Sequence, residues 1–221
     1  MIYITGDTHG DLSDIESRNI GKIKKGDILI ITGDFGFLWD NSKSEIKALK
    51  KLSKKKFTIL FVEGVHENFD MINEHEDVEI FENSAKKIAD NIYCLKRGAI
   101  YTIEGKSVFC LGGGGVDDPF ENLDSDPLND KAMPTDEVLQ EAVNNLQSIQ
   151  KNVDIIITHE APASVKKLIR RDSNINDLNI FFDTLLHNVR YKMWYFGSLH
   201  TDRALSTNMT CAWQEVVKVE F

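Results

Sequence analysis

Five apolar runs in this chain each end in a short turn that carries an aspartate or a histidine. They lie at positions 2–5, 27–32, 57–62, 153–157 and 193–196. Continuous runs rich in β-branched residues and bounded by glycine are typical of strands buried on both faces. Helical patterns lie between several of the runs, which predicts an α/β fold. In such folds, ligands bind beyond the carboxyl ends of the strands.

The side chains at these five turns are those that bind transition metals. The turns read GDTHG, GDFG, GVHE, THEAP and GSLH, and they supply Asp7, His9, Asp34, His66, His159 and His200. Taken singly, each is ordinary turn chemistry. Together, their imidazoles and carboxylates suit Mn, Fe or Zn. The two other histidines, His75 and His187, lie in helical or polar surroundings, so we expect them to be surface residues.

Between the runs, apolar periodicity predicts helices over 43–53, 135–150, 163–170 and 177–189. The stretch 91–111 indicates a meander of short strands, with a hairpin turn at Glu104–Gly105. Residues 112–134 are rich in Gly, Asp and Pro and predict a long surface loop. Such a loop is either functional or a flexible acidic insertion. The sequence contains neither a nucleophile elbow nor a Walker A motif.

Length and charge narrow the class of protein. A chain of 221 residues favours a single domain over 1–221. A formal net charge of -9 disfavours nonspecific nucleic-acid binding, which needs a basic surface. It does not exclude an anionic substrate, because a bound metal inverts the local sign of the charge.

The sequence also indicates a compartment. The start of the chain lacks the pattern of a signal peptide, and no apolar run reaches the roughly 18 residues of a membrane span, so we expect no membrane association. Three cysteines that lie far apart favour reduced thiols over a disulfide framework. The expected location is therefore cytoplasmic.

In this order, the five motifs resemble the motif series of the calcineurin-like metallophosphoesterases, and the resemblance runs from Asp7 to His200. The segments GDFGFLW and LKRG are similar to a bacterial and phage branch of that superfamily. The resemblance implies a two-sheet β-sandwich flanked by helices, in four α/β/β/α layers. It also implies a centre for two divalent transition metals. Mn is the expected metal, and Fe and Zn are alternatives.

The same resemblance assigns roles to the residues at the turns. It implies that Asp7, His9, Asp34 and His200 hold the first ion and that Asp34 bridges to a second. His159 matches a ligand of the second ion. His66 matches the histidine that donates a proton to the leaving oxygen or steadies the phosphate.

Two positions depart from the family pattern, and both belong to the second metal site. Val65 stands where the family has a ligating asparagine, and Ser198 stands where it has a ligating histidine. We therefore expect one firm site and a second site that is weak or empty. Four nearby acids are alternative ligands, but we interpret them as solvated surface charge; they are Glu67, Asp117, Asp118 and Glu160.

Three hypotheses follow. The first is a metal-dependent phosphoesterase that hydrolyses a phosphomonoester or phosphodiester of a small molecule or nucleotide. The second is a catalytically impaired relative that serves as a binding or regulatory module. The retention of His66 favours the enzyme, whereas Val65 and Ser198 favour the impaired relative. The third, a nucleotide-binding α/β protein without metal, leaves the histidines and aspartates unexplained.

Overall fold

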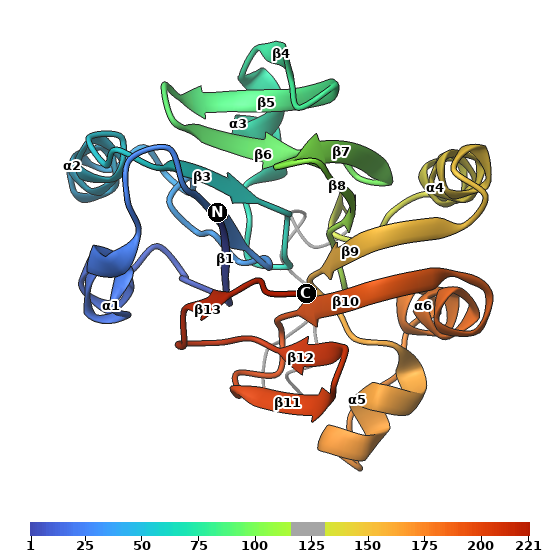
Figure 1. Ribbon diagram of the computed structural model, residues 1–221. Helices are drawn as coiled ribbons and strands as arrows, with labels where there is room; N and C mark the ends of the chain where they lie inside the picture. The colour runs from blue at the N-terminus through green and yellow to red at the C-terminus, as the bar shows by residue number, and fades with distance from the viewer. Residues whose placement is uncertain (116–130) are drawn as a thin grey trace.

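Two mixed β-sheets face each other and are flanked by helices in the computed structural model, which describes residues 1–115 and 131–221 (Figure 1). The parallel strands expected from the sequence lie at the centre of these sheets. The α/β fold with two packed sheets is therefore confirmed.

The first sheet is built on four parallel strands with antiparallel strands at its edges. Its order is β13 (Val217–Lys218), β1 (Ile2–Thr5), β2 (Ile28–Ile31), β3 (Thr58–Phe61), β6 (Ile92–Leu95), β5 (Asn83–Ala89) and β4 (Asp77–Ile80). Strands β1, β2, β3 and β6 run parallel, so the turns after β1, β2 and β3 meet at one edge.

The second sheet has the same plan. Its order is β11 (Arg203–Ser206), β12 (Met209–Cys211), β10 (Arg190–Phe196), β9 (Asn152–Thr158), β8 (Lys106–Leu111) and β7 (Ala99–Ile103). Strands β8, β9, β10 and β12 run parallel, whereas β7 and β11 are antiparallel edge strands. The turns after β9 and β10 carry the remaining predicted motifs.

Alternation of side chains along the strands builds three hydrophobic cores. In β1, Tyr3 packs outward in a core with helix residues such as Leu52, while Ile2 and Ile4 pack inward between the sheets. A third core joins the outer face of the second sheet to helix residues such as Phe182. The cores therefore separate four layers, in the order helices, sheet, sheet, helices.

The helices divide between the two outer layers. On the first sheet, the core includes residues of α1 (Leu12–Ser17), the 3₁₀ turn η1 (Ile20–Lys22), α2 (Lys43–Leu52) and α3 (Phe69–Glu74). On the second sheet, the core includes residues of α4 (Asp136–Ser148), α5 (Ala163–Ile169) and α6 (Asp177–Asn188). The four helices expected from periodicity correspond to α2, α4, α5 and α6.

The meander predicted over 91–111 is only partly correct. Strands β7 and β8 form the expected hairpin, and its turn residues Glu104 and Gly105 have φ of 52° and 71°. Strand β6, however, pairs with β3 in the first sheet. The chain crosses between the sheets after β6, where Gly98 has a φ of 75°. Three short strands in series do not reveal which of two sheets each one joins.

Within the described residues, no helix combines the length and apolar character that a membrane span requires. The three cysteines are free and buried.

Candidate metal centre

Four side chains from two sheets converge where the strands end. Asp7 and His9 follow β1, Asp34 follows β2 and His200 follows β10. One potential ligand atom from each lies within 4.8 Å of all the others. This is the set that the sequence predicts for the first ion, drawn from positions up to 193 residues apart.

The nitrogen and oxygen atoms of these four side chains lie close enough together to bind one ion. The Nε2 atoms of His9 and His200 are 3.0 Å apart, and Nε2 of His200 lies 3.3 Å from Oδ2 of Asp7. Nδ1 of His9 lies 3.9 Å from Oδ2 of Asp34. Burial lowers the pKa of His9 and outweighs the opposite effect of the two carboxylates. A lowered pKa favours the neutral imidazole, which is the form that binds metals.

These residues fit a divalent transition metal. Oδ1 of Asp7 is buried and has no hydrogen-bond partner among the described residues. Leaving a buried carboxylate oxygen unpaired is costly, and a cation removes that cost. Two imidazoles and two carboxylates form the mixed nitrogen and oxygen donor set that such ions accept.

His159, which follows β9, lies on the other side of the two carboxylates. Its Nδ1 is 3.5 Å from Oδ1 of Asp7, and its Nε2 is 3.7 Å from Oδ1 of Asp34. Asp34 therefore directs one oxygen towards His9 and the other towards His159. Burial lowers the pKa of His159, but the charges of Asp34 and Asp7 outweigh it and raise the pKa to about 10. The surroundings of His159 favour positive charge.

The ring of His159 is also oriented by the backbone. Its Nδ1 lies 3.1 Å from the carbonyl oxygen of Thr32, which can only accept a hydrogen bond. In the neutral ring, Nδ1 then carries the proton, and the lone pair of Nε2 faces Asp34. Metal-binding histidines are commonly oriented in this way.

His66 adjoins the cluster from the turn after β3. Its ring centre lies 5.5 Å from that of His9. The side chain is half-buried, and with His9 it lines a cleft of about 930 Å³. His66 therefore has access both to the centre and to the open space beside it.

Val65 and Ser198, the two positions that differ from the family pattern, contact the candidate ligands through their main chains. Val65 and His66 donate main-chain N–H groups to Oδ1 of Asp34, at 2.7 and 2.8 Å. Ser198 donates its main-chain N–H to Oδ2 of Asp7, at 3.0 Å. The turns at Val65 and Ser198 still position the two carboxylates, although neither side chain is the ligand that the family pattern has there.

The backbone at the centre is strained. Four of its residues have positive φ, with 44° at His9, 43° at Asp34, 65° at Ser198 and 47° at His200. Such conformations cost on the order of 1–3 kcal/mol each and cluster at functional sites. Surrounding bonds hold them, since the main-chain N–H groups of Thr8 and His9 both bond to the carbonyl of Asp34, at 2.9 and 2.8 Å.

Glycine is required next to two of the candidate ligands. A Cβ at Gly33 would overlap the ring of His159, and φ there is 118°. A Cβ at Gly197 would overlap the carboxylate of Asp7. These glycines let side chains from the two sheets approach closely across the centre.

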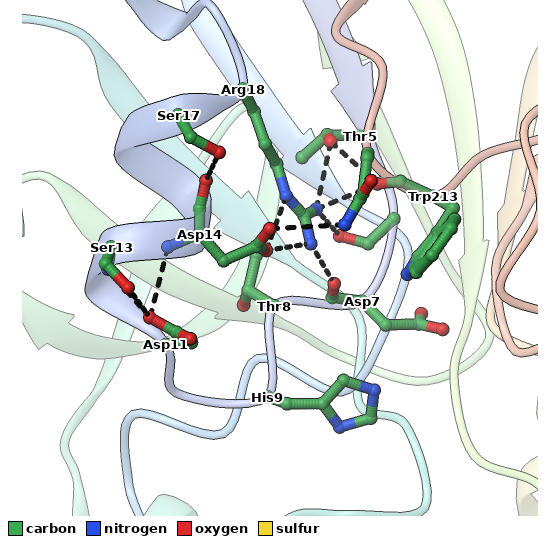
Figure 2. Close-up of polar contacts among 12 residues, drawn as sticks. Thr5, Asp7, Thr8, His9, Asp11, Ser13, Asp14, Ser17, Arg18 and Trp213 are labelled. Carbon is green, nitrogen blue, oxygen red and sulfur yellow. Dashed lines mark hydrogen bonds and ion pairs between the residues drawn. The ribbon is translucent and has the colours of Figure 1, made fainter.

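Arg18, which sequence analysis did not identify, clamps the first motif (Figure 2). Its buried guanidinium donates to the carbonyls of Asp7 at 2.5 Å and of Gly6 and Trp213 at 2.8 Å. It is also paired with Asp14. Arg18 thus ties the loop that carries Asp7 and His9 to the C-terminal segment. Arg18 caps the C-terminal end of α1, and its spacing of four residues from Asp14 was the available signal for their ion pair.

The interpretation of Glu67 as solvated surface charge is wrong. Its side chain is buried, and it accepts the main-chain N–H groups of Phe35 at 2.6 Å and Gly36 at 3.2 Å. Burial, followed by the charge of Asp34, raises the pKa of Glu67 to about 8. Its carboxyl group supports the turn after Asp34, because those two amides would otherwise lack an acceptor.

The same interpretation is wrong for Glu160. It is buried and paired with Lys166 at 3.0 Å, and it accepts from Asn179 at 2.9 Å and Asn176 at 3.1 Å. A buried carboxylate is stable only when paired in this way. The other two acids, Asp117 and Asp118, lie outside the described residues, as does most of the predicted long loop.

Comparison with known proteins agrees with this geometry. The model of the family described as calcineurin-like phosphoesterase matches residues 1–208. A search of curated proteins found no match to this chain.

One solved structure resembles the fold over most of the chain. It is a Staphylococcus aureus protein assigned as a 5′-nucleotidase, in complex with α-ketoglutarate. It is 12% identical with a TM-score of 0.52, over 97% of this chain and 48% of that one. This chain thus spans about half the length of that neighbour. A protein of unknown function from Aquifex aeolicus is 18% identical with a TM-score of 0.38, over 84% of this chain and 92% of that one.

Proposed function

The chain belongs to the calcineurin-like phosphoesterase family, and on that premise we propose that it hydrolyses a phosphomonoester or phosphodiester with one firm metal site and a weaker second one. The observation that carries the proposal is the convergence of Asp7, His9, Asp34 and His200 within 4.8 Å.

We further propose that residues 1–221 act as one domain. Manganese is the proposed metal, with iron and zinc as alternatives, because the mixed nitrogen and oxygen donor set suits all three ions. The cytoplasm is the proposed compartment because the three cysteines are free.

In this proposal, these four residues hold the first ion, and Asp34 and His159 offer the second site. When bound, divalent ions there supply Lewis-acid chemistry, which activates water and offsets the charge of the phosphoryl group. The chain's own part is to fix the ligands before substrate arrives. The amides of Val65, His66 and Ser198 hold the two carboxylates, and Arg18 holds the loop of Asp7.

His66 is the proposed proton donor to the leaving oxygen. Its half-buried ring stands beside His9 and borders the cleft, where a substrate can reach it. It contacts neither carboxylate through its side chain, and among the described residues its ring has no hydrogen-bond partner. A histidine that borders both the centre and the cleft is placed to donate a proton to a leaving oxygen there.

The second site is proposed to be weak for two reasons. Val65 offers no side-chain donor atom, and the Ser198 hydroxyl is a poor substitute for imidazole. In addition, Oδ1 of Asp34, the oxygen that faces His159, already accepts two main-chain hydrogen bonds. The buried acids do not compensate, since Glu67 and Glu160 are engaged elsewhere.

A binding or regulatory module is the second candidate, and the loss of two ligand positions at one site favours it. Metal analysis and turnover distinguish the two candidates. We expect the purified protein with saturating manganese to hydrolyse a generic aryl phosphate or phosphodiester. Protein that binds one ion but hydrolyses neither compound would support the module instead.

A further inference from the structure

The cleft beside the candidate metal centre is lined mostly by residues that have no role in the proposed hydrolysis. It begins at His9 and His66 and continues between the first residues of α1 and one face of α2. Its volume of about 930 Å³ is at the upper end of the range for small-molecule sites. Trp39, which belongs to the GDFGFLW segment, lies in its wall.

Trp39 is an exposed aromatic side chain on a fixed backbone. The residue is 40% exposed, and among the described residues its ring has no aromatic or cationic partner. Its main-chain N–H donates to Glu45 at 2.5 Å, and its carbonyl accepts from Asn68 at 2.7 Å. Both contacts hold the residue in place, so the indole is presented with little loss of backbone freedom on binding.

The acidic groups of the cleft are bound within the protein, whereas one of its basic groups is available to a ligand. The three acids are turned to the protein's own amides: Asp11 caps α1, Asp40 accepts from Ser42, and Glu45 accepts from Trp39 and Asp40. Lys51 is paired with Glu16. Lys47 is exposed and has no hydrogen-bond or ion-pair partner in the part of the chain that the structure describes. A ligand in the cleft therefore meets an aromatic face and an available cationic donor.

From this arrangement we propose that the cleft binds the leaving group of the phosphate ester and that this group is a nucleoside-sized alcohol whose flat aromatic base stacks on Trp39. The inference rests on the proposed function, because it takes His66 as the residue that protonates the leaving oxygen. The leaving group must then extend past His66, and the cleft is the space that His66 borders. Lys47 lies where it can donate to oxygen or nitrogen atoms at the edge of the base.

The reaction implied is a simple hydrolysis. One water forms a new bond to phosphorus, and the bond between phosphorus and the ester oxygen breaks. The departing oxygen takes a proton from His66, and a proton from the water restores His66. For adenosine 5′-monophosphate the products are phosphate and adenosine, and the cleft holds adenosine throughout.

The test compares esters that share a phosphate but differ in the leaving group: adenosine 5′-monophosphate, ribose 5-phosphate and phenyl phosphate. The proteins are the parent, Trp39→Ala, Trp39→Phe and the matched control Ile46→Ala, whose exposed side chain lies on α2 outside the cleft. Adenosine binding by equilibrium dialysis gives a second readout that needs no hydrolysis.

We expect the parent to favour adenosine 5′-monophosphate over ribose 5-phosphate in kcat/KM by at least about fivefold, which is the lower range for stacking of one base on an aromatic side chain. Trp39→Ala should lose that preference and bind adenosine correspondingly more weakly. Trp39→Phe and Ile46→Ala should keep most of both.

Two outcomes would overturn the inference: a preference and adenosine affinity that survive in Trp39→Ala, or a parent that favours phenyl phosphate over the nucleotide. A different result separates the two proposals. If the parent hydrolyses no ester but binds adenosine in a manner that depends on Trp39, the proposed hydrolysis fails and the binding cleft is supported.

Discussion

Val65 donates its main-chain N–H to Oδ1 of Asp34 at 2.7 Å, so the residue that departs from the family pattern still holds the carboxylate proposed to bridge two ions. The departure therefore removes a side-chain ligand without removing the support of the turn. Ser198 has the same relationship with Asp7, at 3.0 Å. The four residues proposed for the first ion converge, whereas Val65 and Ser198 do not offer the side chains that the family pattern has at the proposed second site.

Metal stoichiometry is the most direct consequence. We expect the protein as isolated to hold nearer one transition-metal ion than two per chain, because one group of four potential ligands converges among residues 1–115 and 131–221. Elemental analysis before and after incubation with manganese would measure this. Two tightly held ions per chain would show that other residues complete the second site.

Asp34→Asn should weaken metal binding and lower phosphoesterase activity by about 100-fold or more, because the amide loses the charge and one ligating oxygen. Titration with manganese and turnover of an aryl phosphate would show both effects. His75→Asn is the control, since His75 ends α3 and belongs to neither the cluster nor the cleft. Equal losses in the two variants would contradict the assignment of Asp34.

Arg18→Met should destabilise the fold by about 3 kcal/mol, because buried carbonyls lose a charged donor and Asp14 loses its partner. The loop that carries Asp7 and His9 should also loosen, which would weaken metal binding in protein that is still folded. Urea unfolding and a manganese titration at low temperature measure the two effects.

The matched control for this variant is Arg203→Met, because Arg203 is exposed. It should change neither quantity. If Arg18→Met is less stable but binds manganese as the parent does, Arg18 supports the fold and does not position the metal ligands.

The strands that carry the site were predictable because they are buried on both faces. Strands β1, β2 and β3 are nearly continuous runs of apolar residues that end in glycine-containing turns, so sequence alone locates Asp7, Asp34 and His66 at one edge. Strand β4 was missed. Its residues alternate between exposed and half-buried, and its sequence DVEI is half acidic. Helix α1 was missed because its six residues bury only Ile15.

The supporting residues were harder to predict than the candidate ligands. Glu67 and Arg18 act on main-chain amides and carbonyls of other loops, and such partners leave no pattern in the sequence. Glu160 was misjudged for a related reason, because its partners Lys166 and Asn179 become neighbours only when α5 and α6 pack together. Charge in a sequence does not reveal whether it is buried and paired.

Restoring the second site tests the meaning of both departures. The double change Val65→Asn, Ser198→His adds one amide oxygen and one imidazole to Asp34 and His159. Affinity for a second ion should rise substantially, because the number and type of ligands govern it. Hydrolysis of an aryl phosphate should rise at least about tenfold, because two ions clamp the reacting oxygens better than one.

The two single changes serve as controls, and the pair should exceed the sum of their effects, because residues that share one centre act non-additively. The backbone permits the test. Ser198 already has a φ of 65°, so a histidine there meets no new strain in φ. The main-chain hydrogen bonds to Asp7 and Asp34 do not depend on the side chains that are replaced.

Turnover and metal content with saturating manganese would be compared for all four proteins. A double variant that still binds one ion and turns over no faster than the parent would mean that the pocket differs by more than two side chains, and the binding module would then be the better account of this protein.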